Sequence, residues 1–296
     1  MKGLRKPNII FLTDSFPPLF DATSRINKSL IIHLCKNYNV EIVCPYLKSN
    51  SENNYPKNLK IQRLSIPFVK TRNIYRKLIK FILFSILATN HLIFKGLKKD
   101  IIIIHTSPPI LILISTIPIK ILDLFQKKTP KLLLIAHDLY PDIIFRNTKN
   151  ILYKISSKIF KISYKRFDKI ISCCDSINDK FFYIYKINKN KLEIVYCSSL
   201  IPRNLICDNH NINFSTFKKN KPKILLMGNI GDLHLPKNII NSFTFLLKKI
   251  PDLEFNTYIT GGKANFLNNN FLSFKNFKSY PLVNEKDLSL IYQQPI

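Results

Sequence analysis

Four of the six glycines lie in two short segments that have the arrangement of a phosphate-binding loop. Gly228 and Gly231 belong to MGNIGDLHLPKNII, which follows a predicted strand and leads into a predicted helix with Pro236 in its first turn. Gly261 and Gly262 end the next predicted strand, in YITGG. Because glycine has no side chain, a ligand can approach the backbone closely at each of these positions.

The two segments predict a site for the phosphates of a nucleotide. Backbone N–H groups around Asn229 and the positive end of the following helix would face the phosphates, and Lys237 would add a positive charge. The alternative is an ordinary turn between a strand and a helix, since G-x-x-G alone is also found there.

A second polar cluster, AHDLYPD at 136–142, follows the apolar run KLLLI. Polar groups at the carboxyl end of a buried parallel strand face the crevice where open α/β sheets bind ligands. We expect His137 to donate to a substrate hydroxyl or to stabilise charge that develops there, with Asp138 orienting it. The alternative is a histidine that ends the strand and an aspartate that begins a turn before Pro141.

A third polar segment, TDSFPPLFDATSR, lies between the first predicted strand and the first predicted helix. Thr23 or Ser24 is expected to cap that helix. Arg25 would stand in the first turn, where the helix dipole disfavours a cation, and this favours contact with an anion. Pairing with Asp21 or Asp14 is the alternative.

Other chemistries lack their motifs. The chain has no G-x-S-x-G, no Walker loop and no H-E-x-x-H, and Ser107 in HTSPPI has no obvious base. A G-x-G-x-x-G is missing after the first strand, which argues against a nicotinamide site. The six cysteines include no C-x-x-C pair, so we expect reduced cytosolic thiols and neither a disulfide framework nor a metal site.

Short β-rich runs alternate with longer helical stretches, and runs such as IIII and LLLIA are apolar on both faces. This is typical of a parallel sheet covered by helices on each side, so the predicted fold class is α/β, doubly wound. The predicted strands of the first 200 residues are 8–13, 40–44, 60–64, 101–105, 131–136, 169–172 and 192–196, and helical spacing is found at 24–36, 72–95 and 150–166.

Two Rossmann-like domains are expected, an N-terminal one over 1–200 and a partial C-terminal one over 222–296. Residues 197–221 are polar and irregular, and we place a linker at 201–221. The alternation then resumes with strands at 223–227 and 254–260 and helices at 236–249 and 285–292. That is short for a doubly wound domain.

The formal net charge is +28, and hydrophobic residues make up 46% of the chain, which excludes a disordered basic tail. Such a charge attracts polyanions. We expect an anionic membrane surface rather than nucleic acid, because the basic residues are spread out and no nucleic-acid module appears. The apolar run at 78–97 is interrupted by Lys80 and other polar residues, so we expect a buried helix, with an interfacial membrane helix over 74–97 as the alternative.

Taken together, the motifs resemble family 4 glycosyltransferases of the GT-B fold, most of all the bacterial subgroup that builds exopolysaccharide, capsule and O-antigen repeat units. The matching stretches are FPPLFDATSR, TSPPI, HDLYPD, MGNIGDLHLPKNII and ITGGK, in the family's order and spacing. HDLYPD is similar to that subgroup's HDLWPD, with Tyr140 in place of Trp. The resemblance covers the chain from Asn8 to about Gln293.

The resemblance implies a retaining glycosyltransferase of hexosyl or N-acetylhexosaminyl type. Such an enzyme moves a sugar from a nucleotide-sugar to a lipid-linked saccharide in cell-surface polysaccharide or lipopolysaccharide biosynthesis. The apolar helix near residues 72–97, with its flanking basic residues, and the net charge predict that the protein works in the cytoplasm, peripherally at the inner face of the plasma membrane. No metal ion and no cofactor are implied, since the nucleotide-sugar is a co-substrate. By position, His137 would lie near the donor sugar, the loop Gly228–Gly231 at the leaving diphosphate, and Pro18, Asp21 and Arg25 along the acceptor cleft.

The sequence also departs from the family pattern. Asp21 stands where the family normally has Gly, and Asp232 where the subgroup often has a basic residue. The family's acidic E-x7-E region would follow roughly where this sequence ends, so we expect a C-terminally truncated transferase. A non-catalytic remnant or binding protein is therefore an alternative function, and a basic nucleic-acid binder is a third.

Overall fold

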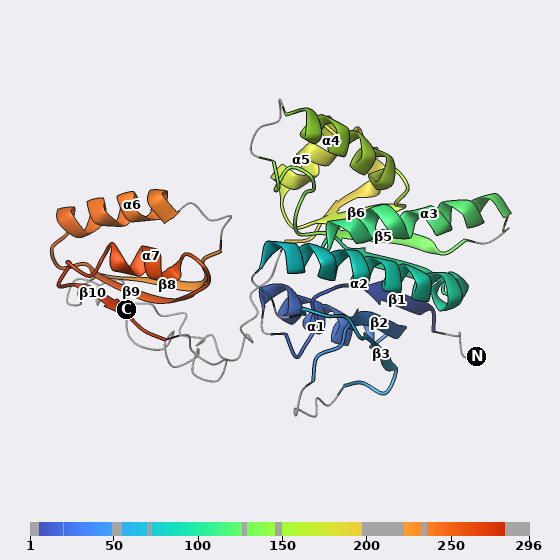
Figure 1. Ribbon diagram of the computed structural model, residues 1–296, viewed down its shortest axis with the longest axis horizontal. Helices are drawn as coiled ribbons and strands as arrows, with labels where there is room; N and C mark the ends of the chain where they lie inside the picture. The colour runs from blue at the N-terminus through green and yellow to red at the C-terminus, as the bar shows by residue number, and fades with distance from the viewer. Residues whose placement is uncertain are drawn as a thin grey trace, which may run out of the picture. The chain divides into compact units, whose positions relative to one another are not determined.

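The computed structural model of the chain describes residues 6–19, 21–48, 55–69, 71, 73–125, 129–145, 150–196, 222–231 and 236–281. The chain divides into two compact units, Met1–Leu200 and Ile201–Ile296 (Figure 1). The linker predicted at 201–221 and the helix predicted at 285–292 lie outside the described residues.

In the described part of the first unit, seven strands form one sheet in the order β3-β2-β1-β4-β5-β6-β7, and every neighbouring pair is parallel. The strands are β1 (Asn8–Leu12), β2 (Asn39–Pro45), β3 (Leu59–Leu64), β4 (Ile101–His105), β5 (Lys131–Ala136), β6 (Lys169–Ser172) and β7 (Leu192–Ile194). The strand order reverses at β1, because the chain passes from β3 back to β4 on the other side. Open α/β sheets bind ligands at such a reversal, outside the carboxyl ends of the strands.

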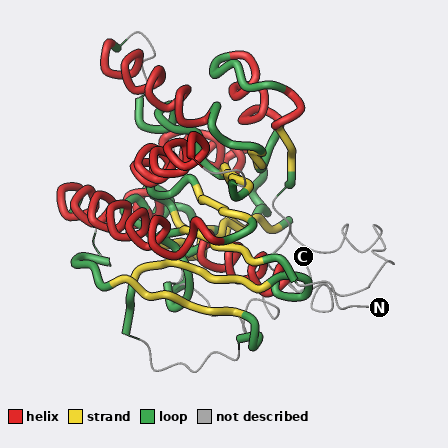
Figure 2. The backbone as a smooth tube through the Cα atoms, turned by 90° about the vertical axis from the view of Figure 1, so that its right-hand side faces the viewer, coloured by secondary structure: helices red, strands yellow, loops and turns green. Residues whose placement is uncertain are grey.

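Helices cover both faces of this sheet (Figures 1 and 2). α1 (Ala22–Leu34) packs on one face. The opposite face carries α2 (Ile74–Lys95), α3 (Pro109–Phe125), α4 (Ile151–Tyr164) and α5 (Asp175–Tyr183). Single 3-10 turns, η1 (Gly96–Lys98) and η2 (Lys189–Lys191), precede β4 and β7.

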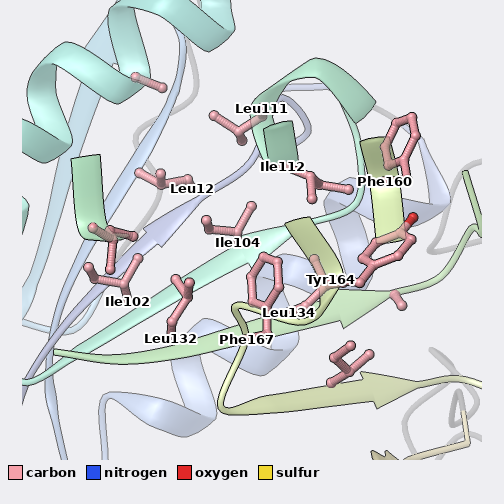
Figure 3. Close-up of a cluster of buried hydrophobic side chains, with 14 of the residues drawn as sticks. Leu12, Ile102, Ile104, Leu111, Ile112, Leu132, Leu134, Phe160, Tyr164 and Phe167 are labelled. Atoms are coloured by element: carbon pink, nitrogen blue, oxygen red, sulfur yellow. The ribbon is translucent and has the colours of Figure 1, made fainter. Parts of the chain in front are cut away.

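The core follows from the period of two along each strand. Ile9 and Phe11 of β1 pack toward α1, whereas Ile10 and Leu12 pack toward the four-helix side. Figure 3 shows the latter cluster, in which Leu12 lies with side chains from β4, β5 and the helices above them. The strands are therefore apolar on both faces because both faces are covered, as the runs IIII and LLLIA predicted.

α2 packs against the seven-stranded sheet along one of its faces. Its buried stripe is formed by Phe84, Ala88 and Leu92. Two of the polar residues that interrupt its apolar run also face inward: Lys80 pairs with Asp14 at 3.0 Å, and His91 with Glu41 at 3.0 Å. Among the described residues, Tyr75–Lys95 is the one helix that could cross a membrane by length and composition alone.

The described part of the second unit holds a smaller parallel sheet in the order β10-β9-β8. Its elements are β8 (Lys223–Asn229), α6 (Pro236–Lys249), β9 (Glu254–Thr260), α7 (Ala264–Asn269) and β10 (Phe277–Ser279). Phe255 is the centre of its core, with its ring stacked on Phe243 at 4.3 Å and edge-on to Phe271 at 5.1 Å.

The predicted fold class is confirmed. Every strand expected in the first 200 residues forms, and the sheet is parallel throughout. α5, α7 and β10 were not among the predicted elements; each has ten residues or fewer, which leaves little periodicity to detect.

Candidate active site

Polar residues from three of the sequence motifs lie along the carboxyl edge of the seven-stranded sheet. β1, β4 and β5 are neighbours, and the chain leaves them at Thr13, Thr106 and His137. The loops are joined to one another: the Thr106 N–H donates to the Ile135 carbonyl at 3.0 Å, and the Asp138 N–H donates to the Thr106 hydroxyl at 3.4 Å. The structure thus places His137 and Asp138 at the sheet edge where ligands of open α/β sheets bind.

A pair of imidazole rings forms the centre of this edge. Nε2 of His105, the last residue of β4, lies 3.1 Å from Nδ1 of His137, and the two rings meet edge to face. The Ser107 N–H donates to Nδ1 of His105 at 3.1 Å. His105 is only 1% exposed, whereas His137 is half-buried.

His105 is the site residue that sequence reasoning missed. A polar residue that ends the run IIII was visible, and it lies directly before TSPPI. What the sequence did not give was the strand order, which puts the end of β4 beside the end of β5.

Burial sets the charge of these groups. Burial and, to a smaller extent, the neighbouring His137 lower the pKa of His105 to about 3, although the hydrogen bond from Ser107 opposes the shift. Burial also lowers the pKa of His137, against the opposing charge of Asp138. The pKa of Asp138 is raised by burial and lowered by His137. Both rings are therefore neutral at pH 7.

The rest of HDLYPD holds His137 in place. The carbonyl of Tyr140 accepts a hydrogen bond from the Tyr164 hydroxyl at 2.8 Å and lies 3.3 Å from the Tyr185 hydroxyl oxygen. The Tyr185 hydroxyl donates its proton to the Asp142 carboxylate. The ring of Tyr140 stacks on Phe160 in the core. An aromatic residue at 140 and a carboxylate at 142 are thus explained by packing and by loop anchoring.

The cap predicted for the first helix is wrong. Asp21, and neither Thr23 nor Ser24, is the N-cap of α1, and its carboxylate accepts from the Ser24 N–H at 2.7 Å. The Ser15 hydroxyl donates to the same oxygen. An aspartate satisfies a free N–H and complements the helix dipole at this position. The negative charge that replaces the family's glycine is therefore used at the start of α1.

Arg63 anchors the proline turn that follows β1. Arg63, at the end of β3, donates to the Pro17 carbonyl, and its guanidinium lies 5.6 Å from the centre of the Phe16 ring. Pro18 is half-buried in this turn, and Arg25 is half-buried in the first turn of α1. The structure thus places Pro18, Asp21 and Arg25 in one segment beside the carboxyl end of β1.

In the second unit, the two glycine segments lie side by side. β8 and β9 pair along their whole length, so that Asn229 faces Thr260. Beyond the strands, the Ile230 N–H donates to the Thr260 carbonyl at 2.7 Å, and the Lys263 N–H donates to the Ile230 carbonyl at 3.1 Å. The segments with Gly228 and Gly261 are therefore one structural feature at the carboxyl edge of this sheet.

Gly228 and Gly261 meet different requirements. Both have positive φ, +123° and +107°, which glycine adopts readily. A Cβ at Gly261 would lie 2.6 Å from the Ile230 carbonyl oxygen, whereas no atom of the described residues lies within 4 Å of a Cβ at Gly228. Gly261 thus permits the two segments to pack, and Gly228 has no close neighbour among the described residues.

The other residues predicted for this loop are only partly described. Pro236 is the first residue of α6, as predicted, and Lys237 follows it with an exposed side chain. Gly231 and Gly262 continue the two segments, and Asp232 lies outside the described residues.

Comparison with known proteins agrees with the fold. The profile of Glycosyltransferase Family 4 matches residues 24–198, more than half of the chain. A comparison of this chain with curated proteins found no match.

Several solved structures are similar at low sequence identity. WaaG, a glycosyltransferase involved in lipopolysaccharide biosynthesis, has a TM-score of 0.58 and 12% identity over 96% of this chain and 72% of its own. Alr3699/HepE of Anabaena, in complex with UDP-glucose, has a TM-score of 0.57 and 10% identity over 94% and 70%. A UDP-forming α,α-trehalose-phosphate synthase from Burkholderia vietnamiensis has a TM-score of 0.59 and 10% identity over 95% and 75%. At these identities the similarity shows the fold, which is of GT-B type.

Proposed function

This chain belongs to Glycosyltransferase Family 4 and is a glycosyltransferase, and on that premise we propose that it moves a sugar from a nucleotide-sugar to a lipid-linked saccharide, with retention, in the assembly of a cell-surface polysaccharide. The observation that carries the proposal is the carboxyl edge of the seven-stranded sheet. There the HDLYPD segment is hydrogen-bonded to His105 and Thr106 at the end of β4, and the FPPLFDATSR segment follows the neighbouring strand β1. Two of the similar structures support the substrate classes: WaaG is involved in lipopolysaccharide biosynthesis, and Alr3699/HepE was solved in complex with UDP-glucose.

In this proposal the glycine segments of the second unit hold the donor diphosphate. Gly228 has no described residue within 4 Å of a Cβ at its position, so a phosphate can approach the backbone there, and Gly261 lets the neighbouring segment approach. Lys237, exposed in the first turn of α6, supplies a positive charge near a helix N-terminus. Fixed N–H dipoles and positive charge stabilise the diphosphate as it leaves, which is the main electrostatic task of such a reaction.

In the first unit, His137 acts on the donor sugar as a hydrogen-bond donor. Its ring is neutral at pH 7 because burial lowers its pKa. A neutral imidazole that is already hydrogen-bonded on one nitrogen presents one N–H to a sugar hydroxyl. Pro18 and Arg25, which are half-buried in the segment that follows the nearby strand β1, belong to the acceptor side.

An assay of sugar transfer tests this proposal. The full-length chain is incubated with a panel of nucleotide-sugars and a lipid extract that contains lipid-linked saccharides, and labelled sugar in the lipid fraction is measured together with the nucleoside diphosphate released. We expect one donor to give both products in equal amounts, and NMR of the new linkage to show the donor's anomeric configuration. Release of nucleoside diphosphate without labelled lipid, or inversion at the anomeric carbon, would contradict the proposal.

We further propose that the enzyme works in the cytoplasm, peripherally at the inner face of the plasma membrane. The outer face of α2 supports this: Tyr75 and Phe94 are 74% and 77% exposed, and Lys77 and Lys95 lie close to them in the helix. Apolar side chains flanked by cations are typical of helices that rest in an anionic bilayer interface. The chain's net charge of +28 acts in the same direction.

Vesicle flotation tests this attachment. The chain should float with vesicles that contain anionic lipid and stay in the soluble fraction with purely zwitterionic ones. Phe94→Ser should weaken flotation, whereas Leu272→Ser, which removes a side chain that is 68% exposed in the second unit, should not. A chain that does not float with anionic vesicles is not attached in this way.

A further inference from the structure

We propose that His105 is a positioning residue that fixes His137 in the tautomer with its proton on Nε2, so that a neutral N–H donor, and not a base, faces the donor sugar. The role toward the sugar rests on the proposed function. The tautomer does not, and it follows from the hydrogen bonds of the first unit alone.

The hydrogen bond between Ser107 and His105 determines which ring nitrogen of His105 is protonated. A backbone N–H can only donate, and that of Ser107 lies 3.1 Å from Nδ1 of His105. Nδ1 of His105 therefore carries the lone pair. Because burial keeps this ring neutral, with a pKa of about 3, its single proton must be on Nε2.

The tautomer of His105 in turn determines the tautomer of His137. Nε2–H of His105 points across 3.1 Å to Nδ1 of His137, which must accept. The proton of the neutral His137 ring is therefore on Nε2, the ring nitrogen that does not contact His105. The main chain on the other side is also held, since the Cys173 thiol lies 3.7 Å from the His137 carbonyl.

This arrangement opposes protonation of His137. A proton on Nδ1 of His137 would face the Nε2–H of His105. If His105 instead carried its proton on its own Nδ1, that proton would face the N–H of Ser107. Each alternative leaves two donors in contact inside the fold, which is costly for buried polar groups. The chain Ser107, His105, His137 therefore gives a donor of fixed direction and no proton acceptor.

The tautomer can be read directly by NMR of the full-length chain with 15N-labelled histidine. His137→Gln identifies the signals of His137. We expect the wild-type ring to show a protonated Nε2 and a hydrogen-bonded, unprotonated Nδ1. His105→Leu should release Nδ1, so that both tautomers appear, while His105→Gln, whose side-chain amide can still donate, should keep more of the original one. His33→Leu, at an exposed histidine of α1, is the matched control and should change nothing.

Activity is the second readout. His105→Leu should lower kcat about 10- to 100-fold, the loss typical when a partner that orients an imidazole is removed, with a smaller change in the KM for the nucleotide-sugar. A wild-type His137 protonated on Nδ1, or charged at pH 7, overturns the proposal even if the chain transfers sugar. The predicted tautomer in a chain that transfers no sugar would instead contradict the proposed function and leave the positioning intact. If His105→Leu does not fold, the wild-type spectrum still decides.

Discussion

Lys80 and Asp14 form an ion pair inside the first unit: Nζ lies 3.0 Å from Oδ2, and the two side chains are only 11% and 7% exposed. The pair joins α2 to the segment that leaves β1 at the carboxyl edge of the sheet. The helix with the apolar outer face is thus tied to the edge that carries His137.

Removing one partner of this pair should be costly. Lys80→Met leaves the carboxylate of Asp14 buried and unpaired, and its other oxygen, Oδ1, already has no partner among the described residues. We expect the free energy of unfolding to fall by about 3–5 kcal/mol, and the double variant Lys80→Met/Asp14→Asn to recover part of the loss. Urea denaturation measures both. Lys77→Met, at an exposed position one turn away, is the control; equal stability of the two lysine variants would show that the pair contributes nothing.

The two glycine positions of the second unit should respond differently to alanine. At Gly228 the new Cβ has no neighbour within 4 Å in the described part of the chain, and the positive φ accounts for an expected cost of about 1–2 kcal/mol. At Gly261 the new Cβ would also meet the Ile230 carbonyl, so the segments must separate and the cost should be clearly larger. Thermal unfolding of the two full-length variants compares them directly. A Gly261→Ala variant as stable as Gly228→Ala would disprove this account of the packing.

Glu41 predicts a dependence of stability on pH. Burial raises its pKa, but hydrogen bonds from Lys99 and His91 and the charges of Lys99 and Lys60 outweigh burial, so the pKa of Glu41 is lowered from 4.5. A carboxyl whose pKa is lower in the folded state stabilises the fold above its unfolded pKa and loses that contribution as pH falls through the folded pKa.

The variant Glu41→Gln should therefore be less stable than the wild type at neutral pH, and the difference should shrink as the pH is lowered below about 4.5. Chemical denaturation at several pH values measures this. Glu193→Gln serves as control, because Glu193 pairs with Lys169 at the surface, where an ion pair contributes little. A difference for Glu41→Gln that grows toward low pH would contradict the sign.

The fold could be predicted from the sequence because its strands carry an unusually direct pattern. Ile101–His105 and Lys131–Ala136 are mostly apolar on both faces, which is typical of a parallel sheet with helices on both sides. The boundaries of α1 were less predictable. Asp21 caps this helix through contacts with Ser15 and Ser24, and the nearby Thr23 and Ser24 are also favoured caps by residue type.

Only the residues of the candidate site that belong to a single sequence motif could be predicted. His137 and Asp138 could be identified because polar residues directly follow an apolar strand. His105 and Lys80 could not be assigned, because their partners are 32 and 66 residues away and the pairing depends on strand order and on which face of α2 turns inward. Gly228 and Gly261 were identified as a pair, but their separate reasons appear only from the distances around each Cβ.

The measurement that tests the central claim most directly is sugar transfer by His137→Ala, with His33→Ala as the matched control at an exposed histidine of the same unit. With the donor identified from the nucleotide-sugar panel, we expect His137→Ala to lose about 100-fold or more in kcat and His33→Ala to keep the wild-type rate, with both variants folded at the assay temperature. Wild-type transfer by His137→Ala would contradict the account, because the residue at the centre of the proposed site would then not act on the sugar.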